Sequence, residues 1–332
     1  MRSFVICGLG LIGRQRLAAL LDFGIDPTEI SLYDPILDLD QDLKFKHFSK
    51  IVSESELYSR NLSHVVVSAP HDVAIEIVRG FANKGAHIMM EKPMGRNLSE
   101  AIEIWETVDP LNLSIGFNYR FMPGIKLLKQ NLEMQLYGTL SSIRIDIGHG
   151  GSPNDLESWK LNLSRAGGGA LLDPGIHVFD LLLYLFGCSP AEIVINGANK
   201  WAGFWDTGIE ESVNIVGICD KVPFTISISL VAWRTRFKVE VIGADAYSII
   251  DGRGRSEGPQ VHTFGKRWGW MNSTSQKDSE TVELLSQNDN SILDETKSWL
   301  TDKSNLATSL DGLKSMQLYD LIAKNLDTNG NF

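Results

Sequence analysis

The sequence predicts an α/β protein: a doubly wound parallel sheet, followed by an α+β domain with a large, mostly antiparallel open sheet. Up to about residue 122, short apolar runs alternate with helical patterns, which is typical of a parallel sheet with crossover helices. From residue 123 on, segments of alternating polarity dominate, as expected of half-exposed strands. We therefore expect two domains, residues 1–122 and residues 123–332.

The first expected strand, residues 3–7, runs into a G-x-G-x-x-G turn that opens a helix. In this motif the first glycine permits the tight turn, the second lets the backbone approach a pyrophosphate, and the third lets helix pack on strand. Amide groups at the helix N-terminus favour phosphate. The first domain is thus expected to be a dinucleotide-binding Rossmann domain. Its expected cofactor contacts here are Gly8, Gly10, Leu11, Ile12 and Gly13.

Asp34 ends the second expected strand, residues 30–33, about 20 residues after the last glycine of the motif. A carboxylate at this place can bind the ribose hydroxyls of adenosine, and it repels a 2′-phosphate. No arginine follows closely, so NAD is favoured over NADP. The alternative is a simple turn residue before Pro35.

Composition narrows the class of protein. The chain has 332 residues, 43% apolar and 22% charged, as in ordinary globular proteins, and a net charge of −10 that argues against a nucleic-acid partner. No apolar stretch approaches the roughly 20 residues of a membrane span, so we expect no membrane contact and a cytoplasmic location. Cys7, Cys188 and Cys219 show no metal-ligand spacing, so neither a metal site nor a disulfide framework is expected.

Two later strands of the parallel sheet end at polar or proline-containing segments. The run 64–68 stops at Ala69-Pro70-His71, and the run 87–90 continues into Glu91-Lys92-Pro93. Ligands bind at the carboxyl ends of strands in such folds. We expect Ala69, Pro70, His71, Glu91 and Lys92 around the cofactor, with Lys92 at the ligand-binding edge of the sheet.

The stretch 167–180 combines three glycines with an acid and an imidazole. The glycines are expected to leave room for a close approach of substrate and cofactor. Pro174 suits the first turn of a helix and Asp173 its N-cap, which would place Asp173 and His177 one turn apart on one face. The alternative is an ordinary capped helix whose His177 and Asp180 are solvated or paired in the core.

With Glu91-Lys92-Pro93, the chain resembles the glucose–fructose oxidoreductase / inositol dehydrogenase (Gfo/Idh/MocA) family. The resemblance spans nearly the whole length and implies the two-domain fold described above. It is carried by five ordered signals, at residues 8–13, 91–93, 118–121, 167–180 and 237–252.

The resemblance implies that Lys92, Asp173 and His177 form the catalytic group and contact substrate. His177 is the natural base, because an imidazole titrates nearest neutral pH. Lys92 supplies a positive charge beside a developing alkoxide, and Asp173 orients the base or holds a neighbouring hydroxyl. The peptide before Pro93 is often cis in the family.

The resemblance also implies that Asn118 lies near the nicotinamide and that Tyr119 and Arg120 line the substrate side. For Arg120 a structural ion pair is the alternative. Trp159 and Arg165 are candidates for substrate selection by their position in a variable loop. Where family members commonly have a histidine beyond the proline of the third strand, this chain has Ala74, and His71 is a candidate to take over the cofactor contact.

We predict an NAD-dependent dehydrogenase or reductase that acts on a secondary alcohol or ketone of a sugar, cyclitol or nucleotide-linked sugar. The similarity implies a homo-oligomer, a dimer or tetramer, formed through the C-terminal sheet. Three alternatives are an NADP-dependent carbonyl reductase of the same fold, an NAD-using glycosidase and a non-catalytic dinucleotide sensor.

Overall fold

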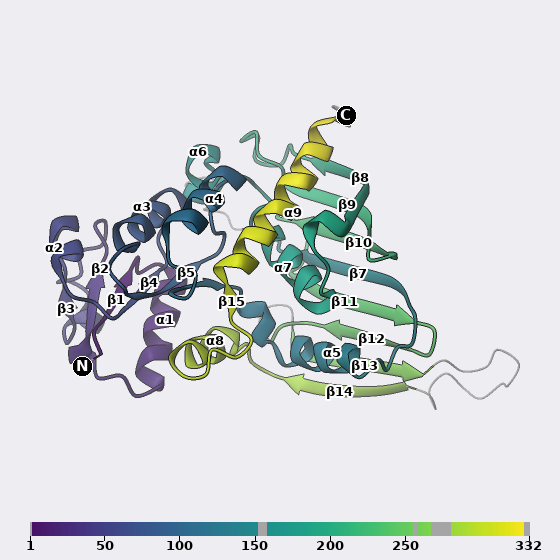
Figure 1. Cartoon of the computed structure of the whole chain (residues 1–332), viewed down its shortest axis with the longest axis horizontal. Helices are drawn as coiled ribbons and strands as arrows, with labels where there is room; N and C mark the ends of the chain where they lie inside the picture. The colour runs from purple at the N-terminus through teal and green to yellow at the C-terminus, as the bar shows by residue number, and fades with distance from the viewer. Residues whose placement is uncertain (1, 152–157, 255–257, 267–279, 329–332) are drawn as a thin grey trace, which may run out of the picture. The chain divides into compact units, whose positions relative to one another are not determined.

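The structure, a computed structural model, describes residues 2–151, 158–254, 258–266 and 280–328 (Figure 1). The chain forms two compact units. The first contains Met1–Asn118, Ser164–Gly167 and Ser291–Met316, and the second contains Tyr119–Leu163, Gly168–Asn290 and Gln317–Phe332. The division near residue 120 lies close to the expected boundary, but two later segments belong with the first unit.

A parallel sheet with the strand order β15-β6-β5-β4-β1-β2-β3 forms the centre of the first unit. Only the short edge strand β15 pairs antiparallel, with β6. Strands β1, β2 and most of β4 and β5 are buried, which explains why they read as continuous apolar runs. The strands are β1 Phe4–Cys7, β2 Ile30–Tyr33, β3 Ser49–Lys50, β4 His64–Val67, β5 His87–Glu91, β6 Leu113–Gly116 and β15 Ala307–Thr308.

The strand order of this sheet reverses between β1 and β4, which run side by side with Cys7 opposite Val67. Right-handed crossovers then place α1 on one face and α3 and α4 on the other. Helix α8 packs against α1, and α3 packs against α4. The carboxyl ends of β1 and β4 form the switch point where such folds bind ligands. The helices are α1 Leu11–Asp22, α2 Glu54–Ser59, α3 His71–Phe81, α4 Leu98–Thr107 and α8 Ser291–Leu300.

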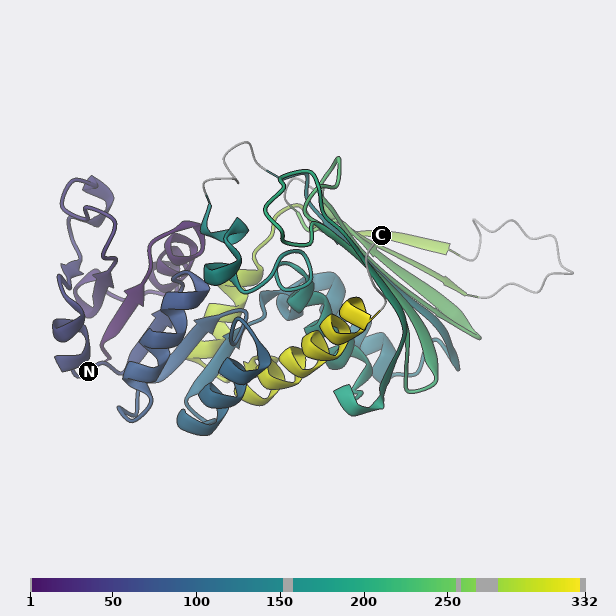
Figure 2. The same ribbon diagram turned by 90° about the horizontal axis from the view of Figure 1, so that it is seen from above.

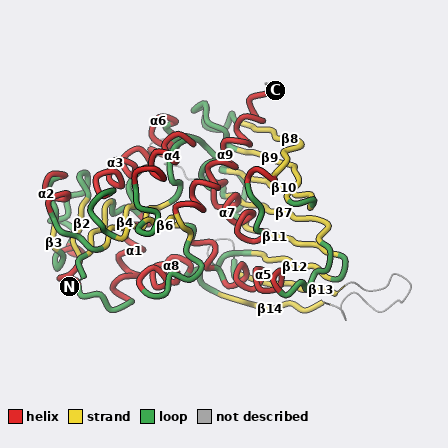
Figure 3. Tube along the Cα trace, viewed as in Figure 1, coloured by secondary structure: helices red, strands yellow, loops and turns green. Residues whose placement is uncertain are grey.

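The second unit is organised around a sheet with the order β14-β13-β12-β11-β7-β10-β9-β8 (Figures 2 and 3). Its pairs are antiparallel except β7 with β10. The strands are β7 Leu140–Gly148, β8 Ile193–Trp201, β9 Ser212–Cys219, β10 Val222–Ser229, β11 Arg236–Gly243, β12 Ala246–Asp251, β13 Gln260–Lys266 and β14 Glu280–Ser286. The mostly antiparallel open sheet predicted from the sequence is confirmed.

One face of this second sheet is covered by helices. Helix α5, Pro123–Glu133, packs on β12 to β14, and α7, Gly175–Phe186, packs on β7 (Figure 2). The side chains facing them form the core: Phe237, Val239 and Val241 of β11 are fully buried. No helix among the described residues covers the opposite face (Figure 2). The remaining helices are the short α6, Leu163–Ala166, and the C-terminal α9, Ser309–Thr328.

Two expectations about local structure are wrong. The amphipathic pattern of residues 280–300 predicts a helix, but Glu280–Ser286 is strand β14 and the helix begins at Ser291. Residues 280–286 form a strand because they pair with the edge strand β13. A disulfide joins Cys188 to Cys219, whose Cα atoms are 6.4 Å apart, although none was expected. Pairing of β8 with β9 sets Ile193 opposite Cys219 and so brings the two distant cysteines together.

Two kinds of feature are absent from the part of the chain that the structure describes. Within it, no helix has the length and apolarity needed to cross a membrane. Among the same residues, no cluster of histidine, cysteine and carboxylate side chains is arranged to hold a metal ion.

Candidate functional site

The glycine-rich turn follows β1 and opens α1, as predicted. Gly8 has a φ of +88°, and a Cβ there would lie 2.7 Å from the carbonyl oxygen of Ser68. A Cβ on Gly13 would lie 1.9 Å from the carbonyl oxygen of Gly8. The chain's own close packing therefore requires both glycines. Ser68, which the sequence analysis did not single out, donates its hydroxyl to the Gly8 carbonyl at 2.8 Å and holds the turn against β4.

Gly10 differs from its two neighbours. It is the N-cap of α1 with φ −65°, a conformation open to any residue, and no atom of the chain lies within 4 Å of a Cβ built on it. Apart from its two chain neighbours, none of the residues that the structure describes requires a glycine here. A side chain would instead occupy space beside the first amides of α1, which is the space a pyrophosphate needs. The residues present thus fit a dinucleotide.

Asp34 lies directly beside this turn. Its Oδ2 accepts a hydrogen bond from the Leu9 amide at 2.8 Å, and its Oδ1 accepts from the amides of Ile36 and Leu37 at 3.0 and 3.1 Å. The carboxylate therefore orders the loop after β2, as the turn alternative required. The same hydrogen bonds hold the Asp34 carboxylate next to the glycine turn, which is also where it would have to lie to bind a ribose.

His71 is the first residue of α3 and is buried, with Pro70 as the N-cap. Its Nδ1 lies 2.7 Å from the carbonyl oxygen of Ala166. A carbonyl only accepts, so Nδ1 carries the proton of this bond. Arg165 in the same short helix donates Nε to Asp72 at 3.0 Å. Both predicted residues thus hold α6 to the start of α3.

Glu91 ends β5 and braces α1. Its Oε1 accepts from Nε and Nη2 of Arg16 at 2.8 and 2.6 Å, and Nη2 also donates to Glu295 of α8 at 2.5 Å. Burial alone would lower the pKa of the Arg16 guanidinium, but the carboxylates of Glu295 and Glu91 raise it above its ordinary value. The buried charge is therefore paired on two sides, and it ties three elements of the first unit together.

Lys92 follows β5 at the carboxyl edge of the sheet, half-buried, and the Lys92–Pro93 peptide is cis, as the resemblance implied. Asn118 is buried and donates its amide to the Ser291 hydroxyl at 2.6 Å. Of the other predicted cofactor-side residues, Ala69 follows the end of β4, and Leu11 and Ile12 are the first residues of α1, after the glycine turn that follows β1.

Asp173 is not the cap of its helix, contrary to expectation. Helix α7 begins at Gly175 with Pro174 as the N-cap, and no side chain caps it. Backbone carbonyls occupy the first amides instead: Ala170 accepts from Gly175 at 2.9 Å. The Asp173 carboxylate is thereby available to a different partner, and its Oδ2 accepts from Lys160 Nζ at 2.9 Å. Lys160 belongs to the 3-10 helix Trp159–Leu161, beside the predicted Trp159, and was missed.

The glycines of the stretch 167–180 meet the chain itself rather than empty space. A Cβ on Gly169 would lie 2.1 Å from the Glu210 carbonyl oxygen, and one on Gly167 would lie 2.4 Å from Cβ of Arg96. The expectation that they leave room for ligands is therefore wrong at these two positions. Glu210 accepts from the amides of Gly169 and Leu171 at 2.9 and 3.1 Å, and burial raises the pKa of its carboxyl.

His177 is buried within α7 and stacks on Tyr119, with ring centroids 4.0 Å apart and planes 2° from parallel. Arg120 donates Nε to Asp180 Oδ2 at 2.9 Å and Nη2 to Oδ1 at 2.5 Å. Both side chains are buried. Arg120 therefore forms the structural ion pair that the sequence analysis gave as the alternative to a substrate contact. The second unit thus brings together His177 with Tyr119, and Asp173 with Lys160.

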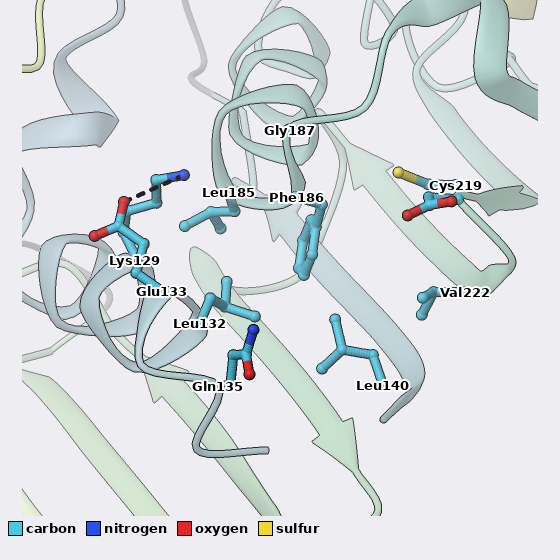
Figure 4. A pocket seen from close by; sticks show the side chains of 11 residues that line it. Lys129, Leu132, Glu133, Gln135, Leu140, Leu185, Phe186, Gly187, Cys219 and Val222 are labelled. Atoms are coloured by element: carbon cyan, nitrogen blue, oxygen red, sulfur yellow. Dashed lines mark ion pairs between the residues drawn. The ribbon is translucent and has the colours of Figure 1, made fainter. Parts of the chain in front are cut away.

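The second unit also has a pocket of about 450 Å³. Figure 4 shows Leu132, Leu185 and Phe186 around it, with Cys219 near its rim. Lys129 and Glu133 on its wall form an ion pair at 3.6 Å. None of the predicted site residues lines this pocket.

Two family matches cover most of the chain. Residues 2–119 match the oxidoreductase family with an NAD-binding Rossmann fold, and residues 125–247 match the GFO/IDH/MocA C-terminal domain. The chain belongs to the Gfo/Idh/MocA oxidoreductase family. The resemblance seen in the sequence is thereby confirmed.

Similar proteins of known name include dehydrogenases of sugars and cyclitols. Levoglucosan dehydrogenase of Pseudarthrobacter phenanthrenivorans is 36% identical over 37% of this chain and 33% of its own length. Myo-inositol 2-dehydrogenase of Thermotoga maritima is 24% identical over 57% of this chain and 58% of its own. The match therefore spans less than two-thirds of either relative.

The fold is shared over the whole length with solved structures. A levoglucosan dehydrogenase in complex with NADH and levoglucosan has a TM-score of 0.81 at 17% identity, covering 99% of this chain and 98% of that one. Aldose-aldose oxidoreductase from Caulobacter crescentus, complexed with glycerol, has a TM-score of 0.79 at 18% identity, with the same coverage of each chain.

Proposed function

We propose that this protein is an NAD-dependent dehydrogenase or reductase acting on a secondary alcohol or ketone of a sugar, cyclitol or nucleotide-linked sugar. The binding of a dinucleotide is supported above all by the open space at Gly10, next to the amides of α1. The substrate class is supported by the names of the relatives, which act on levoglucosan and myo-inositol. When bound, NAD accepts or donates the hydride.

Asp34 supports NAD over NADP. Three backbone amides hold its carboxylate beside the glycine turn, so its charge stays where an adenosine ribose would bind. A 2′-phosphate in the same place would meet this negative charge at short range. Three other expected cofactor contacts support the proposal indirectly, because they fix the elements around the glycine turn. His71 bonds to α6, Glu91 to α1 and Asn118 to α8.

We assign the proton transfer to His177, because histidine is the side chain that most often serves as general acid or base in enzymes. Lys92 stabilises negative charge on the substrate oxygen, because an ammonium in a partly buried place interacts more strongly than one in water. Asp173 holds a neighbouring hydroxyl, and Lys160 orients that carboxylate through the 2.9 Å ion pair. Tyr119 sets the plane of the His177 ring.

We also propose that the open face of the second sheet joins copies of the chain. No helix of the described part covers this face (Figure 2). The strand register places exposed apolar side chains on it at both edges of the sheet: Val194, Trp201, Val216, Val282 and Leu284. Exposed apolar area of this kind is typical of interaction sites. Light scattering on the purified protein tests the proposal; a dimer or tetramer that Val216→Lys converts to monomer is expected, and a monomeric wild type contradicts it.

The proposed activity is tested with a panel of free sugars, anhydrosugars, inositols and nucleotide sugars, with the absorbance of NADH as the readout. We expect stoichiometric NADH formation with at least one member and a preference for NAD. NADPH formation alone would indicate the carbonyl-reductase alternative. Glycoside cleavage without net NADH would indicate the glycosidase alternative, and tight NAD binding without any turnover would indicate a sensor.

A further inference from the structure

We propose that Arg253 is a positioning residue for His177 and acts through Tyr119. The inference rests on the proposed role of His177 as the base. Arg253 follows β12 and is far in the sequence from both Tyr119 and His177. All three residues belong to the second unit.

Tyr119 is held on several sides. Its face stacks on the His177 ring at 4.0 Å, and Phe237 of β11 meets it edge-on at 5.4 Å. Its hydroxyl accepts a hydrogen bond from Nη1 of Arg253, whose Cζ lies 4.8 Å from the ring centroid. The contacts of His177 and Phe237 restrict where the ring lies, and the hydrogen bond from Arg253 restricts its rotation and tilt.

Arg253 is itself fixed from behind. Its Nη2 lies 3.5 Å from Oδ2 of Asp289, whose side chain is 1% exposed, while that of Arg253 is 14% exposed. A charge this far from water is unfavourable unless it is paired and hydrogen-bonded. Asp289 and the Tyr119 hydroxyl meet that need together. The guanidinium therefore has a defined place between them.

The backbone conformation on both sides of Arg253 fixes the position of its side chain. Gly252 and Gly254 flank it with φ of +80° and +81°. A Cβ on Gly252 would lie 2.2 Å from the Pro259 carbonyl oxygen, and one on Gly254 would lie 2.5 Å from the Asn288 carbonyl carbon. Only glycine meets both requirements, the left-handed backbone and the close approach. The Gly-Arg-Gly turn thus holds Arg253 against Asp289.

The consequence concerns the direction of the His177 nitrogens. A base transfers a proton only along the line of its nitrogen lone pair, so a rotated ring is a poor catalyst even when it is present. Stacking on Tyr119 fixes the plane of the His177 ring. If Tyr119 moves, the His177 ring can move with it. Arg253 supplies a polar contact that keeps Tyr119 in place.

The test compares Arg253→Met, Tyr119→Phe and the double variant with the wild type. Arg253→Met keeps the length of the side chain and removes the hydrogen bond, and Tyr119→Phe keeps the stacked ring and removes the acceptor. Each is expected to lower kcat between about 10- and 100-fold with little change in KM. The double variant is expected to lose no more than either single one, because both break the same chain of contacts. Arg253→Lys, which retains a donor and a charge, is expected to recover part of the loss.

A second readout does not depend on turnover. Protons of a ring stacked on an aromatic face are shifted upfield, so the His177 ring signal in histidine-labelled protein, assigned with His177→Gln, reports the stack. It is expected to move downfield in Arg253→Met and Tyr119→Phe, and to stay unchanged in Arg79→Met, an ion-paired arginine on α3. Affinity for NAD, measured by calorimetry, and the unfolding midpoint show whether each variant is folded.

The outcomes separate the two proposals. Losses in kcat that multiply in the double variant, or an unmoved His177 signal in folded Arg253→Met, would overturn the role of Arg253. Absence of turnover with every substrate in the wild type, while the His177 signal still moves as expected, would overturn the proposed function and leave the positioning contact established.

Discussion

Arg120 and Asp180 form a buried two-point ion pair between the 3-10 turn Asn118–Phe121 and helix α7. The two hydrogen bonds measure 2.9 and 2.5 Å, and the side chains are 5% and 1% exposed. The guanidinium also lies over the Tyr184 ring, with Cζ 4.6 Å from its centroid. This contact links the segment that carries Tyr119 to the helix that carries His177.

Removing one partner of this pair is expected to be costly. Arg120→Met leaves the Asp180 carboxylate buried without its arginine, and should lower the free energy of unfolding by about 3–5 kcal/mol. Arg120→Met combined with Asp180→Leu removes both charges and should recover most of that loss. Urea unfolding measures both. A substrate-binding role for Arg120 would be indicated instead by a raised KM with unchanged stability.

Lys92→Met and His177→Gln are expected to separate chemistry from cofactor binding. Neither residue belongs to the glycine turn, so calorimetry should find NAD affinity within about twofold of the wild type. Turnover should fall by about 100-fold or more in each, the usual range for a lost acid–base or electrostatic contact. Lys84→Met, a lysine that donates to the Tyr58 carbonyl, serves as the control. Unchanged turnover in both variants would remove them from the catalytic group.

Asp34→Asn tests the choice of cofactor. The amide keeps one acceptor for the neighbouring backbone amides but loses the negative charge that opposes a 2′-phosphate. The ratio of kcat/KM with NAD to that with NADP should shift toward NADP by about tenfold, which corresponds to about 1.4 kcal/mol. Asp38→Asn, a loop carboxylate that accepts from the Asp40 amide, should leave the ratio as it was. An unaltered ratio in Asp34→Asn would assign the residue to loop structure alone.

His64 is expected to make stability depend on pH. Burial, helped by the neighbouring His87, Arg2 and Lys303, lowers the pKa of His64 from 6.5 to about 4. Between these values the unfolded chain binds a proton that the folded chain does not. The free energy of unfolding should therefore decrease as pH falls from about 6.5 to 4. Urea unfolding of His64→Phe, which keeps a ring beside Phe4 and Trp299, should show a shallower decrease than the wild type. Equal slopes would contradict the assignment.

The disulfide between Cys188 and Cys219 should stabilise the second unit. It closes a loop with a sequence separation of 31. A cross-link of this span typically contributes about 3–4 kcal/mol by restricting the unfolded chain. Cys188→Ser is expected to lower the unfolding midpoint, and a reducing agent should lower the midpoint of the wild type to a similar value. A wild type whose midpoint is the same with and without reductant would show that the bond does not contribute.

Local patterns were sufficient for the cofactor half of the protein. The strand, the glycine turn and the helix are adjacent in sequence, and the backbone needs of Gly8 and Gly13 follow from that short span. Asp34 was predictable because one crossover returns the chain to the edge of β1 at a nearly constant length. The alternation of β9 and β11 likewise revealed the open sheet, since one face of each is buried.

Long-range pairing was beyond the reach of those patterns. The partner of Asp173 is Lys160, the carboxylates that hold Arg16 come from β5 and α8, and Cys188 meets Cys219 through the register of β8 and β9. The local periodicity of the sequence does not reveal these pairings. Each depends on which strand edges and helix faces remain uncovered after the other elements have packed. The sequence by itself determined the family and the fold class, and it supplied the residues that we propose for the site. Only the tertiary structure decided their partners: Gly169 packs against Glu210 rather than leaving room, Arg120 pairs with Asp180, and Arg253 bonds to the ring on which His177 stacks.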